Sequence, residues 1–166
     1  MATTTRAKPP TSPRTRYEDD LYTWVEEQVA LLRAGKLSEI DAANIAEELG
    51  DVARSEFRSL VSAIAIVMLH LLKWDHQPGR RSRSWELSIR EHRARISDDL
   101  KDSPGLKGRL TEAMERGYEY GRIRALEESK LADGAIPEAC PYSFEEVMKR
   151  PVVYQQPKRK RHRTLE

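Results

Sequence analysis

The first repeating pattern of apolar residues predicts a helix near the start of the chain. From about Glu18 to Ala34, apolar positions recur at spacings of three and four, which is the period of an amphipathic helix. The stripe consists of Leu21, Trp24, Val25, Gln28, Leu31 and Leu32. Acidic residues precede it, where a helix dipole favours negative charge, and Gly35 is expected to cap its end.

A second and longer stripe predicts the central column of the fold. The helical period continues from Asp41 to Trp74, and Gly50 lies inside the pattern without interrupting it. Its apolar positions are Ile45, Leu49, Val52, Ala53, Phe57, Leu60, Ile64, Val67 and Leu71. At ~1.5 Å per residue this helix would be about 50 Å long. The second half is apolar on nearly every face, so other helices must surround it.

Two more helices follow a turn at Pro78-Gly79. The third begins near Ser82 or Ser84, either of which can cap it, and ends near Leu100. Its inward positions are Trp85, Ile89, Ile96 and Leu100. The fourth is predicted to begin at Ser103-Pro104, with serine as the cap and proline at the first helical position.

The fourth helix is expected to reach about Lys130. Gly117 and Gly121 lie one turn apart on it, so a neighbouring backbone can approach closely. Ser143 and Glu146 form a capping box for a short last helix. No segment has the pattern of a strand. The pattern predicts an all-α, up-and-down helical bundle, with four main helices and a short C-terminal helix around one long central helix.

The charge distribution changes this picture only at the ends. The 166 residues carry a net charge of +2, but residues 1–16 hold four basic residues and no acid. Residues 158–166 hold five basic residues and one acid, so the middle is left with 20 basic and 26 acidic residues. We therefore expect a disordered basic leader over 1–16, the bundle domain over 17–150 and a disordered basic tail over 151–166.

The remaining composition indicates a soluble, cytoplasmic protein. A single cysteine, Cys140, excludes an intramolecular disulfide and fits a reducing compartment. The longest apolar run, Ala63 to Leu72, is far shorter than the ~20 residues of a membrane span, so no membrane contact is predicted.

The order of several short motifs resembles the bacterial family catalogued as domain of unknown function number 29. The matching pieces are Tyr17-Glu18-Asp19-Asp20, Glu47-Glu48-Leu49, His70-Leu71-Leu72-Lys73-Trp74, Gln77-Pro78, Arg80-Arg81-Ser82-Arg83-Ser84-Trp85, Ile89, Arg93, Pro137 and Cys140-Pro141. The resemblance covers about residues 17–150. It implies an all-helical fold and no particular activity. Leu165-Glu166 resembles an expression-vector remnant.

The arginine-rich turn after the central helix is the best candidate site. Its arginines stand where the third helix exposes free N–H groups, and both features favour an anion. Lys73 ends the preceding helix, and further arginines continue along the third helix. The predicted binding residues are Lys73, Arg80, Arg81, Arg83, Ser84, Arg90 and Arg93. Ion pairing of these arginines with the acidic body is the alternative interpretation.

Residues with catalytic or ligand chemistry are scattered rather than gathered. His70 is interpreted as a core histidine bonded to a carboxylate or carbonyl, and Trp74 and Trp85 as core anchors. Glu48 is 22 residues from His70, about 33 Å along the helix at ~1.5 Å per residue, so the two cannot share a metal. Glu48 is expected on an exposed face or in a salt bridge to an arginine. No metal, cofactor or catalytic constellation is predicted.

The sequence therefore favours a non-enzymatic interaction module. Its arginine-rich turn would contact an acidic protein or a nucleic-acid backbone. A metal-dependent or small-ligand-binding enzyme that uses His70, Lys73 and His92 is the alternative. A homodimer in which the long helix packs across subunits is a third interpretation.

Overall fold

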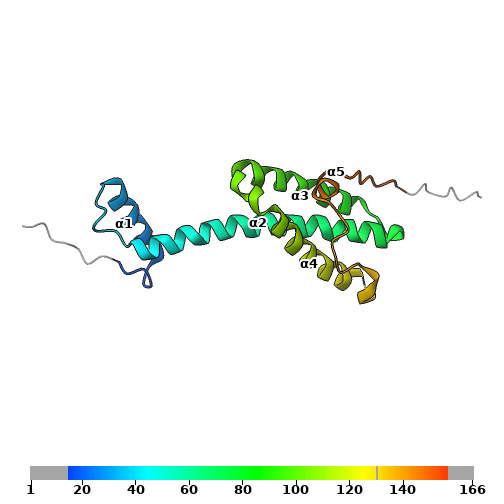
Figure 1. Ribbon diagram of the computed structural model, residues 1–166, viewed down its shortest axis with the longest axis horizontal. Helices are drawn as coiled ribbons and strands as arrows, with labels where there is room; N and C mark the ends of the chain where they lie inside the picture. The colour runs from blue at the N-terminus through cyan, green and yellow to red at the C-terminus, as the bar shows by residue number, and fades with distance from the viewer. Residues whose placement is uncertain (1–14, 130, 157–166) are drawn as a thin grey trace, which may run out of the picture. The chain divides into compact units, whose positions relative to one another are not determined.

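The protein is all-α, as the sequence predicts (Figure 1). The computed structural model describes residues 15–129 and 131–156. They contain no strand. The helices are α1 (Leu21–Arg33), α2 (Ala42–His76), η1 (Pro78–Arg80), α3 (Arg83–Asp102), η2 (Pro104–Arg109), α4 (Leu110–Ser129), η3 (Asp133–Ala135) and α5 (Phe144–Lys149), where η denotes a 3-10 helix. Residues 1–14 of the predicted leader and 157–166 of the predicted tail lie outside this description.

The chain divides into two compact units, and the boundary falls inside α2, between Ala53 and Arg54. Helix α2 continues through Gly50 without a break, as its apolar period predicts. Nothing in the sequence pattern marked this boundary, because one uninterrupted helix supplies residues to both units.

The first unit is organised around two helix caps. Asp20 caps α1 by accepting a hydrogen bond from the Thr23 N–H, 3.1 Å away, and Gly35 ends the helix region with a φ of +68°. Asp41 caps α2 through the Asn44 N–H, while its own N–H donates to Gln28 Oε1 at 2.8 Å. These bonds place the two helices against each other within this unit.

Only half of the predicted stripe of α1 is buried or half-buried. Trp24 and Gln28 are its buried members, whereas Leu21 is 47% exposed, and Val25 and Leu32 are also exposed. On α2, Leu49 and Val52 are 65% and 59% exposed. Helical periodicity identifies the apolar face of a helix, but in this unit few other residues pack against that face.

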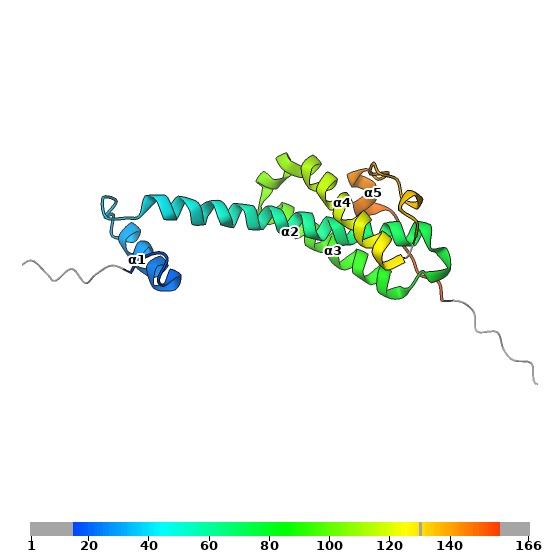
Figure 2. The same cartoon turned by 90° about the horizontal axis from the view of Figure 1, so that it is seen from below.

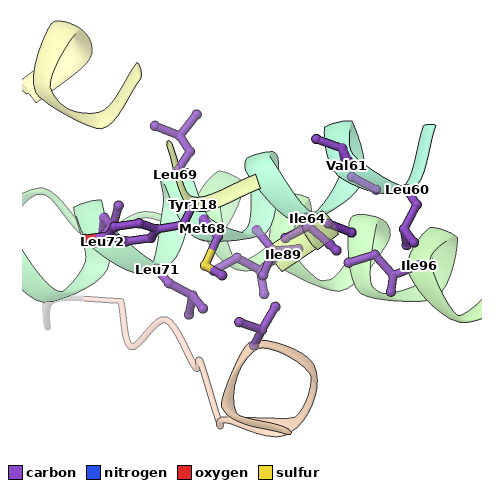
Figure 3. Close-up of a cluster of buried hydrophobic side chains, with 14 of the residues drawn as sticks. Leu60, Val61, Ile64, Met68, Leu69, Leu71, Leu72, Ile89, Ile96 and Tyr118 are labelled. Carbon is purple, nitrogen blue, oxygen red and sulfur yellow. The ribbon is translucent and has the colours of Figure 1, made fainter. Parts of the chain in front are cut away.

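The second unit contains the main core, and its helices run up and down. Helix α3 is antiparallel to α2, and α4 runs in the same general direction as α2 (Figures 1 and 2). The second half of α2 lies among them, as predicted from its apolar faces (Figure 3). The largest fully buried side chains are Leu60, Ile64, Met68, Leu69, Leu71, Leu72, Ile89, Ile96, Ile136, Val67 and Val147.

Two glycines set the close crossing of α4 over α2, as predicted. A Cβ at Gly121 would lie 2.8 Å from the Ala65 carbonyl oxygen and 3.0 Å from the Leu69 nitrogen. A Cβ at Gly117 would lie 2.5 Å from Ile64 Cγ2. At Gly121 the obstacle is backbone, so only glycine fits there without moving a helix.

The start of α4 corrects the sequence prediction. Residues after Ser103 form the 3-10 helix η2, and the α-helix begins only at Leu110. The Ser103 hydroxyl does not cap this segment but donates to Glu56 Oε2 at 3.2 Å. Gly105 and Gly108 both lie in the segment, and glycine disfavours the α-helix.

The other two predicted starts are confirmed. Ser82 is the cap of α3, because its hydroxyl accepts from the Trp85 N–H at 3.4 Å. Ser143 and Glu146 form the predicted capping box of α5.

Helix α2 is long and apolar enough to cross a membrane by length and composition. Most of its apolar stretch is buried within the protein, which is typical of the core helix of a soluble protein.

Candidate functional site

The arginine turn joins the end of α2 to the start of α3 and is firmly held. Arg81 Nε donates to the Trp74 carbonyl oxygen at 2.9 Å, and its guanidinium carbon lies 5.1 Å from the centre of the Trp74 ring. Ser82 caps α3, and the Ser84 hydroxyl lies 2.8 Å from the Ser82 hydroxyl. Arg81, Ser82 and Ser84 therefore fix the shape of the turn.

Three arginines of the turn region carry charge that the described residues do not neutralise. Arg80 and Arg83 are exposed and have no ion pair or hydrogen-bonded side-chain partner in residues 15–129 and 131–156. The same holds for Arg90, which lies seven residues after Arg83 and so on the same face of α3. The turn thus presents three available guanidinium groups to solvent.

Arg93, also predicted as a binding residue, has a different environment. Its Nε donates to the Val147 carbonyl oxygen at 2.6 Å, and a terminal nitrogen donates to the Glu146 carbonyl oxygen at 3.3 Å. Burial, with a contribution from the charge of Arg150, lowers the pKa of Arg93. Arg93 therefore binds the last turn of α5 to α3.

A hollow of about 630 Å³ lies beside the turn. One side is formed by Trp74, Pro78, Gly79 and Arg81, and the other by residues that follow α5. The Tyr154 N–H donates to Glu86 Oε2 at 3.1 Å, which fixes this segment against the first turn of α3. The segment lies in the predicted tail, and sequence reasoning missed its role because it has no apolar period.

Lys73 is itself buried and belongs to a second cluster. Its Nζ lies 2.6 Å from Glu128 Oε2 on α4 and 4.6 Å from the centre of the Trp85 ring on α3. The hydrogen bond from Lys73 is the main cause that lowers the pKa of Glu128. Because Lys73 is only 8% exposed and has both partners, its charge is satisfied within the protein.

His70 lies in the same cluster, and its environment differs from the predicted one. Its ring centre is 6.3 Å from that of Trp85. A bond to a carboxylate or carbonyl was expected, but the buried Nδ1 has no hydrogen-bond partner in the described part of the chain. That expectation is wrong for this nitrogen. Burial, reinforced by the charge of Lys73, lowers the pKa of His70 to about 4.

The other residues of ligand type lie apart from this cluster. His92 Nδ1 is 2.9 Å from the Ser88 carbonyl oxygen of its own helix. Glu48 accepts a hydrogen bond of 2.6 Å from the Tyr17 hydroxyl, a partner that replaces the arginine or open solvent expected for it. This bond is the main cause that raises the pKa of Tyr17 to about 12. In residues 15–129 and 131–156, no three His, Cys, Asp or Glu side chains are grouped so that they could hold a metal ion.

Each of the two tryptophans contacts a cation, Arg81 in the turn and Lys73 in the second cluster. Trp74 is buried beneath Arg81, while Trp85 is half-buried beside Lys73. Glu128 was not singled out from the sequence. No local pattern shows that the end of α4 meets the end of α2.

The fold and the site define a small all-α protein with a positively charged arginine turn between α2 and α3. The chain belongs to the family described as domain of unknown function DUF29, whose model matches residues 16–152. Comparison with curated proteins and with solved structures gave no match.

Proposed function

We propose that this protein is a non-enzymatic interaction module whose arginine turn binds an anionic partner, either an acidic protein or a nucleic-acid backbone. The observation that carries the proposal is the contrast within the turn. Arg81 is bonded to the main chain, while Arg80, Arg83 and Arg90 are exposed and unpaired in the described residues. Arg81 therefore fixes the turn, and the other three guanidinium groups are available to a partner.

The chemistry of the guanidinium group supports a partner rich in phosphates or carboxylates. A planar guanidinium can donate two parallel hydrogen bonds to either anion. The alternative interpretation is that these arginines pair with carboxylates of the acidic body. None of the three exposed arginines has such a partner in the described residues, and Arg93 bonds to backbone carbonyls. Arg150 does pair with a carboxylate, that of Asp75, but it is not one of the predicted binding residues.

Binding of single-stranded RNA at several salt concentrations tests the proposal. The full chain would carry serine in place of the basic residues of the tail, which are Lys158, Arg159, Lys160, Arg161 and Arg163. In this background, the change R80S/R83S/R90S should weaken RNA binding and flatten its salt dependence. The logarithmic slope should fall by about 0.7 for each phosphate contact that is lost.

A matched control removes the same charge elsewhere. Arg33, Lys101 and Lys107 are exposed, and their triple replacement by serine should leave the salt slope unchanged. If both triple variants bind RNA like the parent, the nucleic-acid form of the proposal is wrong. The acidic-protein form then requires that the turn variant loses retention on a polyglutamate matrix while the control keeps it.

One observation favours a second candidate, a metal-dependent or small-ligand-binding enzyme that uses His70, Lys73 and His92. It is the unpartnered buried Nδ1 of His70. The Glu128 partner of Lys73 and the Ser88 partner of His92 weigh against it, because both groups already have bonds. A stoichiometric transition metal in elemental analysis of tag-free protein would support this candidate.

A further inference from the structure

A second cationic surface lies between α2 and α4, away from the residues of the arginine turn. It is a groove of about 400 Å³ in the second unit. The α2 side is formed by Arg58, Val61, Ser62 and Ala65, and the α4 side by Arg116, Tyr120 and Arg124. The lining contains three arginines and no acid. Sequence reasoning missed it because its arginines come from two helices far apart in the chain.

The two helices supply opposing rows of side chains. Arg116, Tyr120 and Arg124 follow one another at intervals of four residues, so they form one row on α4. From α2, Val61 and Ala65 are buried and give the groove an apolar floor. The close helix crossing at Gly121 brings these two rows together.

The charge of the groove is only weakly neutralised. Arg116 lies 3.6 Å from Glu112 Oε1, but Arg109 already binds that carboxylate with two nitrogens, at 3.0 and 2.9 Å. Arg124 lies 3.9 Å from Glu128 Oε1, whose other oxygen binds Lys73 at 2.6 Å. Both carboxylates thus have stronger partners outside the groove.

Arg58 adds a third cation. It is exposed and has no ion pair or hydrogen bond in the described residues. The groove therefore has the charge to hold a compact group with more than one negative charge, such as a phosphate.

The centre of the groove has a different chemistry from its ends. The Tyr120 side chain is 44% exposed, and it lies midway between Arg116 and Arg124 along α4. An aromatic face over a floor of Val61 and Ala65 suits a flat ring. The groove volume is also within the ~300–1,000 Å³ range of small-molecule sites.

We propose that this groove binds a nucleotide, with the phosphates on the arginines and the base against Tyr120 and the apolar floor. Phosphate alone would leave the aromatic and apolar surface unused, and an uncharged ring would leave three guanidinium groups without an anion. The site is separate from the arginine turn, and its ligand is a small molecule rather than a macromolecule.

Isothermal titration calorimetry of the full chain at low salt tests this proposal with two probes, adenosine diphosphate and inorganic pyrophosphate. Adenosine diphosphate should bind more tightly than pyrophosphate, because only the nucleotide carries a base. Tyr120→Ala should weaken nucleotide binding about tenfold and leave pyrophosphate unaffected, since base stacking on an aromatic ring is lost. Tyr120→Phe should restore nucleotide binding because it keeps the ring.

Charge variants assign the phosphate contacts. R58S/R124S should weaken both probes at least about tenfold, because charge-assisted hydrogen bonds are lost. R80S/R83S removes the same charge from the arginine turn and should leave both affinities unchanged. Thermal unfolding of each variant verifies that these surface changes leave the fold intact.

Three results would overturn the inference. The first is a dissociation constant for adenosine diphosphate weaker than about 1 mM. The second is equal affinity for the two probes, which would show only a simple anion site. The third is equal loss of binding in R58S/R124S and R80S/R83S, which would show a diffuse charge effect. None of these results bears on RNA binding by the arginine turn, so the two proposals fail independently.

Discussion

At the scale of single residues, the surroundings of His70 in the second unit determine its protonation state. Its Nδ1 has no partner, and the ammonium of Lys73 is nearby. Both features favour the neutral imidazole, and the charges of His92 and Arg124 act in the same direction. The carboxylate of Glu128 opposes them, but it is occupied by Lys73.

This environment predicts that stability falls in a defined pH window. The pKa of His70 is about 4 in the folded protein and about 6.5 in an unfolded chain, so the unfolded state binds more protons between these values. Stability is therefore complete above pH 6.5 and declines as the pH falls toward 4. His70→Leu should lose this decline, and the midpoint of urea unfolding measured from pH 7.5 to 4.5 checks it.

The matched control is His76→Asn, which removes one imidazole at the end of α2 and leaves the buried cluster intact. It should keep the decline of the wild type. An equal decline in the His70→Leu variant would show that other groups cause the pH dependence. The titration of Asp75 does not change the comparison between the two histidine variants. Burial raises the pKa of Asp75, but bonds from Arg150 and Tyr142 outweigh burial and lower it, and both histidine variants keep this carboxylate.

Sequence reasoning located the arginine cluster but could not separate its members. Arg80 and Arg81 are adjacent in the same motif and both are exposed, yet of the two only Arg81 has a side-chain hydrogen bond in the described residues, to the Trp74 carbonyl oxygen. Lys73 was assigned to the turn, and its partner Glu128 lies 55 residues later in the chain. Backbone acceptors and distant side chains leave no local pattern, so these partners could be found only in the structure.

At the scale of helices, the crossing of α2 and α4 depends on the absence of a side chain at Gly121. Gly121→Ala should destabilise the protein by about 1–3 kcal/mol, because overpacking against the backbone of α2 outweighs the better helix propensity of alanine. Urea unfolding at pH 7.5 measures this change.

Gly105→Ala is the control for the Gly121 variant. A Cβ there would meet nothing within 4 Å, so the free energy of unfolding should stay the same or rise slightly. If the two alanine variants have the same stability, the helices can separate without cost, and the described close contact is not important.

Helix positions were predictable where local chemistry decides them. The caps at Ser82 and Ser143 were both anticipated from side chains that bond a nearby N–H. The start of α4 was not, because Ser103 bonds to Glu56 on α2 instead of capping its own segment. A cap that is lost to a residue 47 positions away cannot be recognised locally.

At the scale of the whole molecule, α2 is one helix with two environments. Its residues up to Ala53 are mostly exposed, and the stretch from Leu60 to Leu72 is mostly buried. Amides in the buried stretch should exchange hydrogen at least ~10-fold more slowly than those of residues 42–53, because their exposure requires opening of the core. Hydrogen exchange read by mass spectrometry on peptides of α2 provides the measurement.

Uniform protection along all of α2 would contradict this expectation. It would mean that the exposed half, with Leu49 and Val52, is covered in solution. The apolar period predicts one helix over both halves of α2, and the apolar residues on nearly every face of its second half predict that other helices surround it. The pattern does not show how little of the first half is covered, because burial depends on the neighbouring helices. Among the described residues the second unit has three other α-helices, while the first has one.

The ion pair between Arg150 and Asp75 has a consequence for where this domain ends. Arg150 follows the last residue of α5, and its guanidinium reaches the carboxylate of Asp75 at 2.8 Å. This ion pair joins two residues that are 75 positions apart, and the segment between them contains α3, α4 and α5. A chain that ended at Lys149, the last residue of α5, would keep every described helix and still lose this ion pair.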